Sequence, residues 1–336
     1  MCWAYSSRER KHVKRLAEDL RKKDSFFGGI IATTAFLALL VFSPHFHNPN
    51  NLDSLQAAIA PNAIIAVGMM ILMIMGMFDL SVGSIMGFSG IVTGYFISRG
   101  YSIPIAVLAG MATGCGIGLI NGLLVAYGKI LPIIATIGTM IVFRGFAEMI
   151  MTSNMAMSLT GFPREFIALG NRKLLGIYPM LWICIIMLVL FWFITKMTYA
   201  GRVIYYIGNS AENAKLMGID VNRTVILAFL LSGVLSALAG ILSVARFESA
   251  SRYLGQNLQM TILIACIIGG GSILGGKGDM LGALFGTIFI VLLSNGFNLF
   301  EVNPQWQSVT IGAILLLVVV ANGYFYLKKM RRLGKL

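Results

Sequence analysis

The chain has 336 residues, of which 57% are hydrophobic and only 12% are charged, and its mean hydropathy is +0.84. Soluble domains carry about a quarter charged residues, and one globular core cannot bury this much apolar surface in water. The composition therefore excludes a soluble enzyme, a disordered chain and a secreted disulfide scaffold, and it indicates a protein of the lipid bilayer. The formal net charge of +13 fits basic cytoplasmic loops better than nucleic-acid binding.

Apolar stretches follow one another along almost the whole chain, behind a basic segment, residues 1–25, that lacks the cleavage site of a signal peptide. A membrane helix needs about 20 mostly apolar residues. We therefore predict an all-α polytopic membrane protein with one transmembrane domain, residues 26–327, and a basic tail, residues 328–336. The ten expected spans are 26–43, 54–77, 80–98, 103–127, 131–152, 178–196, 224–246, 258–274, 280–300 and 306–327.

The third and eighth of these spans are rich in Gly and Ser, so we expect them to be short or broken. Ten spans place both termini on one side of the membrane. If that side is the cytoplasm, nineteen Lys and Arg lie inside and six lie outside, as the positive-inside rule requires. The longest loops are then residues 153–177 outside and 197–223 inside. Neither is large enough for a separate catalytic domain.

A weak internal repeat joins the two halves of the chain. Asn121-Gly122 recurs as Asn295-Gly296, and Thr136-Ile137-Gly138 recurs as Thr310-Ile311-Gly312, both at an offset of 174 residues. A repeat of five spans has an odd count, so its two copies must be inverted in the membrane. The sequence therefore predicts a five-plus-five inverted repeat, an architecture typical of transporters.

Polar residues inside the predicted spans are the candidate functional residues. Asp79 follows an apolar stretch, and an acid there is costly unless its carboxylate is satisfied. It either caps the third span, as Asp and Ser do well, or lines a solute path. Neutral polar residues likewise either bind helices together or line the path. The candidate path residues are Asp79, Ser81, Ser84, Asn121, Thr136, Asn295 and Asn298.

Arg144 and Glu148 lie four residues apart within the fifth span, on one helical face. We expect them to neutralise each other as an intramembrane pair, with solute contact as the alternative. No metal site is predicted, because the cysteines form no CxxC pair and His45 and His47 have no third ligand nearby. The segment Gly271–Lys277 fits G-x-x-x-x-G-K but is followed by Gly278 in place of Ser or Thr, so we interpret it as a tight turn.

Several short motifs, taken in order, resemble the permease subunit of bacterial ribose-type sugar ABC importers over residues 50–326. Each motif alone is weak evidence for this family, but the whole set in this order is specific. They are Asp79–Ser84, Asn121–Tyr127, Lys129, Pro132, Ala135–Met140, Arg144-Gly145, Gly201-Arg202, Gly208-Asn209, Ala214, Gly218-Ile219, Gly269-Gly270, Gly275-Gly276, Gly278, Asn295-Gly296 and Trp306-Gln307.

The resemblance implies a non-catalytic permease in the bacterial inner membrane, with a second permease copy or a sister permease beside it. It also implies an extracytoplasmic binding protein that delivers a small neutral sugar or sugar-like solute. A cytoplasmic ABC ATPase would use ATP and Mg²⁺, so no cofactor is expected in this chain. Residues 211–217 suit a short amphipathic helix stopped by Gly218. The resemblance assigns ATPase coupling to Gly201, Arg202, Gly208, Asn209, Glu212, Ala214, Lys215, Leu216 and Gly218.

Two other classes of membrane protein are alternatives to an ABC permease. An ion- or proton-coupled secondary transporter would need intramembrane acids, for which the candidates are Asp79 and Glu148. A polytopic membrane enzyme would need clustered His, Asp or Glu within the spans, and the sequence has none. Five charged residues at the outer surface either form ion pairs with a binding protein or belong to a hydrated loop, and these are Arg164, Glu165, Arg246, Glu248 and Arg252.

Overall fold

Helices α2 (Pro49–Ile74) and α10 (Val221–Phe247) lie at the centre of the molecule. The structure is a computed structural model, and it describes residues 28–153, 157–303, 305–314, 316–317 and 320. Both helices are apolar around most of their circumference and are largely buried by other helices. Such a pattern is typical of a helix enclosed by protein. The predicted basic segment 1–25, the tail 328–336 and the end of the tenth span lie outside the described residues.

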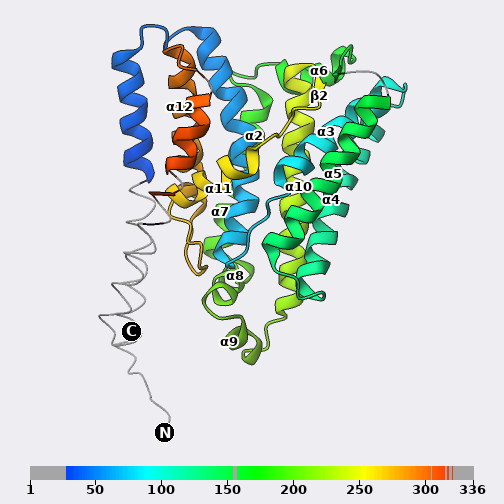
Figure 1. Cartoon of the computed structure of the whole chain (residues 1–336), viewed down its shortest axis with the longest axis vertical. Helices are drawn as coiled ribbons and strands as arrows, with labels where there is room; N and C mark the ends of the chain where they lie inside the picture. The colour runs from blue at the N-terminus through cyan, green and yellow to red at the C-terminus, as the bar shows by residue number, and fades with distance from the viewer. Residues whose placement is uncertain (1–27, 154–156, 304, 315, 318–319, 321–336) are drawn as a thin grey trace.

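The other elements surround this pair (Figure 1). The remaining helices are Gly28–Phe42, α3 (Val82–Ser98), α4 (Ile103–Ala126), α5 (Pro132–Ser153), α6 (Arg164–Asn171), α7 (Pro179–Met197), α8 (Tyr199–Asn209), α9 (Ala211–Leu216), α11 (Leu258–Ile268), α12 (Met280–Leu299) and a helix that begins at residue 305. Strands β1 (Ser158–Leu159) and β2 (Ala250–Ser251) pair antiparallel.

The prediction of an all-α membrane protein is confirmed. Among the described residues, six helices are long and apolar enough to cross a membrane, namely α2, α4, α5, α7, α10 and α12. The third predicted span is α3, with 17 residues, and the eighth is α11, with 11, so both are shorter than a full crossing, as expected. Helix α6 and the short β-pair lie within loops that the sequence did not resolve into elements.

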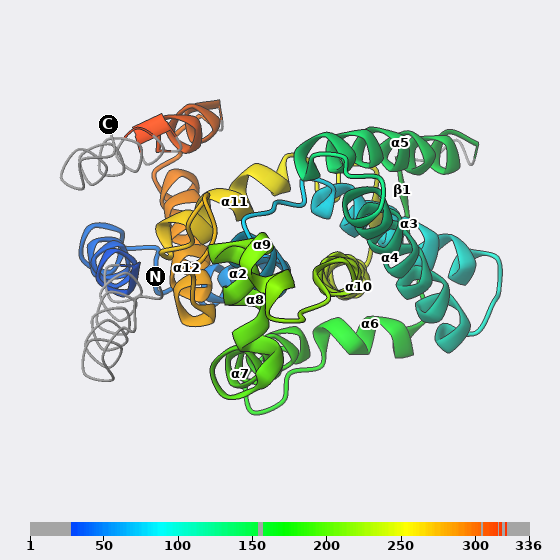
Figure 2. The same ribbon diagram turned by 90° about the horizontal axis from the view of Figure 1, so that it is seen from below.

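The helix pairings follow the repeat seen in the sequence. Helix α4 packs on α10 and α3, while α12 packs on α2 and α11; α3 also packs on α10, as α11 does on α2. Exchanging α2 with α10, α3 with α11 and α4 with α12 therefore reproduces the same set of neighbours (Figure 2). Helix α7 departs from this pattern, because it packs on α2 and α12.

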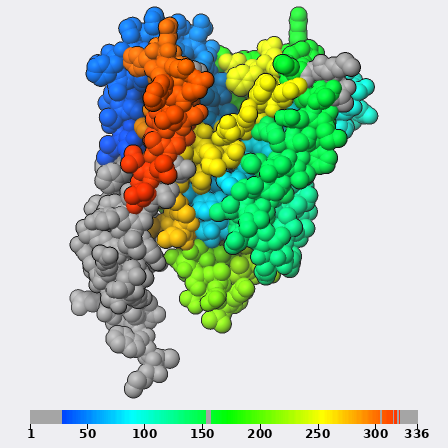
Figure 3. All heavy atoms as spheres, in the orientation of Figure 1, coloured from blue at the N-terminus to red at the C-terminus, as the bar shows by residue number. Residues whose placement is uncertain are grey.

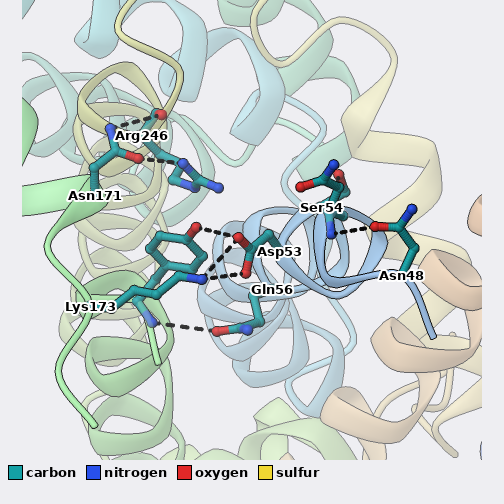
Figure 4. A network of polar contacts seen from close by, with 9 residues as sticks. Asn48, Asp53, Ser54, Gln56, Asn171, Lys173 and Arg246 are labelled. Atoms are coloured by element: carbon teal, nitrogen blue, oxygen red, sulfur yellow. Dashed lines mark hydrogen bonds and ion pairs between the residues drawn. The ribbon is translucent and has the colours of Figure 1, made fainter. Parts of the chain in front are cut away.

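A polar cluster at one end of the molecule shows that α2 and α10 run in opposite directions (Figure 4). Asp53, near the start of α2, accepts hydrogen bonds from Lys173 Nζ and Tyr178 OH, both at 2.8 Å. Arg246, in the last turn of α10, lies 4.0 Å from the centre of the Tyr178 ring and donates to Asn171. The bond to Asp53 raises the pKa of Lys173 above its usual value.

Candidate functional site

A cluster of buried hydrogen bonds surrounds Asp79, which lies in the non-helical segment between α2 and α3. The side chain is fully buried, with 0% exposure. Its Oδ1 accepts hydrogen bonds from Ser81 N at 2.9 Å and Ser81 Oγ at 2.5 Å, and its Oδ2 accepts one from Ser232 Oγ of α10 at 2.8 Å. Burying a carboxylate is costly without such partners, so these donors explain how the sequence tolerates an acid there.

The same cluster continues into α4 and α5. Asn121 Nδ2 donates to Ser81 Oγ at 2.9 Å, and Thr139 Oγ1 of α5 donates to Asn121 Oδ1 at 2.8 Å. One continuous chain of hydrogen bonds thus joins α10, the α2–α3 segment, α4 and α5. Ser81 is the residue preceding α3, but its side chain does not cap that helix; Asp79 takes the Ser81 N–H instead.

The structure separates the remaining candidate path residues. Ser84 and Thr136 are buried and donate to carbonyls within their own chain segments, at Ser81 and Pro132. Asn295 lies elsewhere, on α12, and exchanges hydrogen bonds with Asn51 of α2.

Asn298 is exposed near the end of α12.

The other five candidate path residues are enclosed by helices in this structure, and these are Asp79, Ser81, Ser84, Asn121 and Thr136. The hydrogen bonds of Asp79, Ser81 and Asn121 bind different helices together there, which is the structural alternative raised by the sequence.

Arg144 and Glu148 interact electrostatically, as expected, but their side chains form no contact ion pair, and the hydrogen bonds of Arg144 go to other groups. Its Nη1 donates to the backbone oxygens of Arg252 at 3.2 Å and Leu254 at 3.0 Å. Within the described residues the ion pairs are Lys173–Asp53 and Lys196–Asp279, and Glu148 belongs to neither. Arg144 therefore donates hydrogen bonds to carbonyl groups of an irregular segment. The spacing of residues in the sequence could not show that these carbonyl groups lie beside Arg144.

Two glycines assigned to coupling allow α8 to lie close against its neighbours. A Cβ on Gly208 would overlap the carbonyl oxygen of Ile74 at the end of α2, and one on Gly201 would overlap backbone oxygens of α7. The Tyr205 hydroxyl donates to Gly278 O at 2.7 Å. Helix α8 is therefore fixed against α2, α7 and the loop that precedes α12.

Helix α9 projects beyond the other helices that the structure describes, at the end opposite to α6 and β2 (Figure 1). The prediction of a short helix here is confirmed: Ser210 caps it by accepting from Asn213 N, and Gly218 follows it with φ +79°. Ala214 is buried, whereas Leu216 is 86% exposed and Met217 is 67% exposed. The other polar residues that the resemblance assigns to ATPase coupling are also exposed to solvent, and these are Arg202, Asn209, Glu212 and Lys215.

The charged residues expected to meet a binding protein divide into two groups. Arg164, Glu165 and Glu248 are exposed. Arg246 and Arg252 are half-buried and each has an Nε atom that is buried without a hydrogen-bond partner, so these two point inward.

Comparison with known proteins identifies the family. A family model described as the branched-chain amino acid transport system permease component matches residues 51–319. The chain belongs to this family. The expectation of a transport permease, drawn from scattered motifs, is thereby confirmed.

Individual relatives cover almost the same stretch of chain. The ribose import permease protein RbsC of Haemophilus influenzae is 33% identical over 311 residues, spanning 90% of this chain and 96% of its own. The L-arabinose transport system permease protein AraH of Escherichia coli is 33% identical over 295 residues, spanning 88% of this chain and 89% of its own.

One solved structure supports the fold. It is a metal-chelate type ABC transporter in an inward-facing conformation, with a TM-score of 0.50 and 13% identity. The match covers 90% of this chain and 99% of that chain. At this identity the likeness concerns the arrangement of the helices alone.

The sequence analysis missed two members of the Asp79 cluster, Ser232 and Thr139. Both carried a signal. Thr139 lies three residues after Thr136, within a motif that was noted, and Ser232 is one of three serines in a largely apolar span. Only the fold shows that both hydroxyls face the α2–α3 segment.

Proposed function

We propose that this chain is the permease subunit of an ABC importer for a small neutral sugar or sugar-like solute. The family match supports the permease role, and the similarity to the ribose and L-arabinose permeases supports the solute class. The neutral polar character of the residues in and beside the spans agrees with a solute that is bound by hydrogen bonds and carries no charge. The chain itself would be non-catalytic.

The observation that carries this proposal is the exposed tip of α9. Leu216 and Met217 present large apolar side chains to solvent beyond the membrane-crossing helices, and a charged rim of Glu212, Lys215 and Asp220 surrounds them. An apolar centre with a polar rim is the usual composition of a protein–protein contact. We infer that the ATPase binds here and that α8, fixed against α2 and α7, passes its movement to the membrane helices.

The rest of the assembly follows from this placement. The α9 end would face the cytoplasm of a bacterium, together with both termini, and the chain would lie in the inner membrane. A second permease copy or a sister permease would complete the path. A binding protein would deliver the solute at the opposite end, where Arg164, Glu165 and Glu248 are exposed. ATP and Mg²⁺ would bind to the ATPase.

The Leu216→Asp variant tests the coupling role. A carboxylate at the centre of an apolar contact must be desolvated, so we expect loss of ATPase co-purification and loss of solute-stimulated ATP hydrolysis, with membrane insertion unchanged. The matched control is Leu175→Asp, because Leu175 is 91% exposed in the loop between α6 and α7, at the opposite end. Normal ATPase binding and transport by Leu216→Asp would contradict the proposal.

A further inference from the structure

An irregular segment, residues 252–257, enters the molecule between β2 and α11. Two glycines of α3 allow this approach, since a Cβ on Gly83 would overlap Gly255 O and one on Gly87 would overlap Leu254 O. The segment consists of turns, and Gly255 and Asn257 adopt positive φ angles of +71° and +59°. It lies directly before α11, which begins at Leu258, the first residue of the eighth predicted span, and ends at Ile268, before the predicted end at residue 274.

The contacts place this segment near the middle of the membrane-crossing helices. Gly83 lies in the first turn of α3, 15 residues before its last residue, Ser98. At 1.5 Å per residue this distance is about 22 Å along the helix axis. Arg144, which binds Leu254 O, lies 12 residues after the first residue of α5, Pro132, or about 18 Å along that helix.

Irregular backbone is tolerated at this depth only where protein encloses it or where it borders water, because lipid satisfies no hydrogen bonds. On one side, the segment is enclosed by other parts of the protein. The guanidinium of Arg144 binds the carbonyls of Arg252 and Leu254, and the Leu254 side chain packs into the core. The other side carries Tyr253, which is 58% exposed, and the exposed amides of Gln256 and Asn257.

This polar strip crosses a surface that is otherwise apolar. In Figure 3 the segment belongs to the yellow diagonal band, which also includes β2 and α11, between α5 on one side and the helix that begins at residue 305 on the other. The neighbouring helices α5 and α11 carry exposed apolar side chains, among them Ile141, Met149 and Met260. A phenol and two amides between such helices would be poorly accommodated by lipid chains, so the strip borders either water or the second permease of the proposed assembly.

We propose that Tyr253, Gln256 and Asn257 form the solute-contacting surface of the translocation path, with Arg144 as the positioning residue that holds their backbone in place. Amides that both donate and accept hydrogen bonds suit the hydroxyl groups of a neutral sugar, and the tyrosine ring offers an apolar face to its C–H groups. This inference rests on the proposed function. It moves the path from the enclosed Asp79 cluster to this exposed strip.

Accessibility of single cysteines tests the proposal in the assembled transporter. Tyr253→Cys and Gln256→Cys are each placed in a chain without its four native cysteines and treated, in membrane vesicles, with a membrane-impermeant charged methanethiosulfonate. The control is Val189→Cys, 60% exposed near the middle of α7. We expect modification at positions 253 and 256 to be about tenfold faster or more, because the reactive thiolate requires water. Rates equal to that of Val189→Cys would overturn the proposal.

Protection by solute separates this inference from the proposed function. In vesicles that take up D-ribose or L-arabinose, the transported sugar is expected to slow modification of Tyr253→Cys. Fast modification without protection in such vesicles would contradict solute contact. If the wild-type complex takes up no neutral sugar, the proposed solute class is wrong, whereas the modification rates still decide whether a water-filled path follows this segment.

Discussion

At the scale of single residues, the side chains that link the helices are buried hydroxyls and amides. Ser232 and Ser243 illustrate this, because both lie buried on α10. Ser232 Oγ donates to the Asp79 carboxylate of another segment, whereas Ser243 Oγ donates to Ala239 O within its own helix. The two residues are both buried serines, so the difference in stability between their alanine variants measures the contribution of the hydrogen bond to Asp79.

We therefore expect Ser232→Ala to destabilise the chain by about 1–3 kcal/mol, because one oxygen of a buried carboxylate loses its donor. Ser243→Ala is expected to cost clearly less. Thermal unfolding of the purified chain in mild detergent measures both variants. Equal unfolding temperatures for the two would contradict the role given to the Asp79 cluster.

The sequence predicts the polar residues at this scale but not their partners. Asp79 and Arg144 were recognised because charges are costly within apolar spans. Helical spacing then suggested Glu148 as the partner of Arg144, whereas the structure gives it the carbonyls of Arg252 and Leu254, more than 100 residues away. Contacts between segments so distant in the chain follow from tertiary packing, which local spacing does not encode.

At the scale of elements, glycines determine how closely α4 and α10 approach. A Cβ on Gly114 of α4 would meet Gly233 O and the Ala237 side chain of α10, each at 2.5 Å. Gly116, two residues on, has open space around it. Small residues at such contacts let helix backbones approach each other within a membrane.

The variant Gly114→Ala is accordingly expected to destabilise the chain by about 1–3 kcal/mol, the usual cost of overpacking. Gly116→Ala should instead be neutral or stabilise it by about 0.5–1 kcal/mol, because alanine favours the helix. Unfolding in detergent compares the two variants with the wild type. A loss of stability at Gly116 equal to that at Gly114 would show that helix approach is not the cause.

Most elements could be predicted from hydropathy because the bilayer fixes the length of a crossing helix. The predicted limits of spans such as 103–127 and 280–300 agree closely with α4 and α12. The sequence could flag span eight as irregular from its glycines. It could not show that residues 252–257 lie on Gly83 and Gly87, since that contact joins the two halves of the chain.

At the scale of the whole molecule, α2 and α10 lie at the centre, and the helices around them are arranged in corresponding pairs. The exchange of neighbours between α3 and α11, and between α4 and α12, agrees with the offset of 174 residues in the sequence. In transporters built from inverted repeats, solute sites lie where broken helices of the two halves meet. The crossing of Gly83 and Gly255 is such a place, and it lies beside the proposed solute surface.

Purification of the chain from native membranes in mild detergent, with its stoichiometric partners identified by mass spectrometry, tests the central claim most directly. The account predicts that an ABC ATPase co-purifies with the wild-type chain and is lost from Leu216→Asp while the chain remains inserted. A stable particle without any ATPase that still transports solute in vesicles under an ion gradient would contradict it, and would favour a secondary transporter.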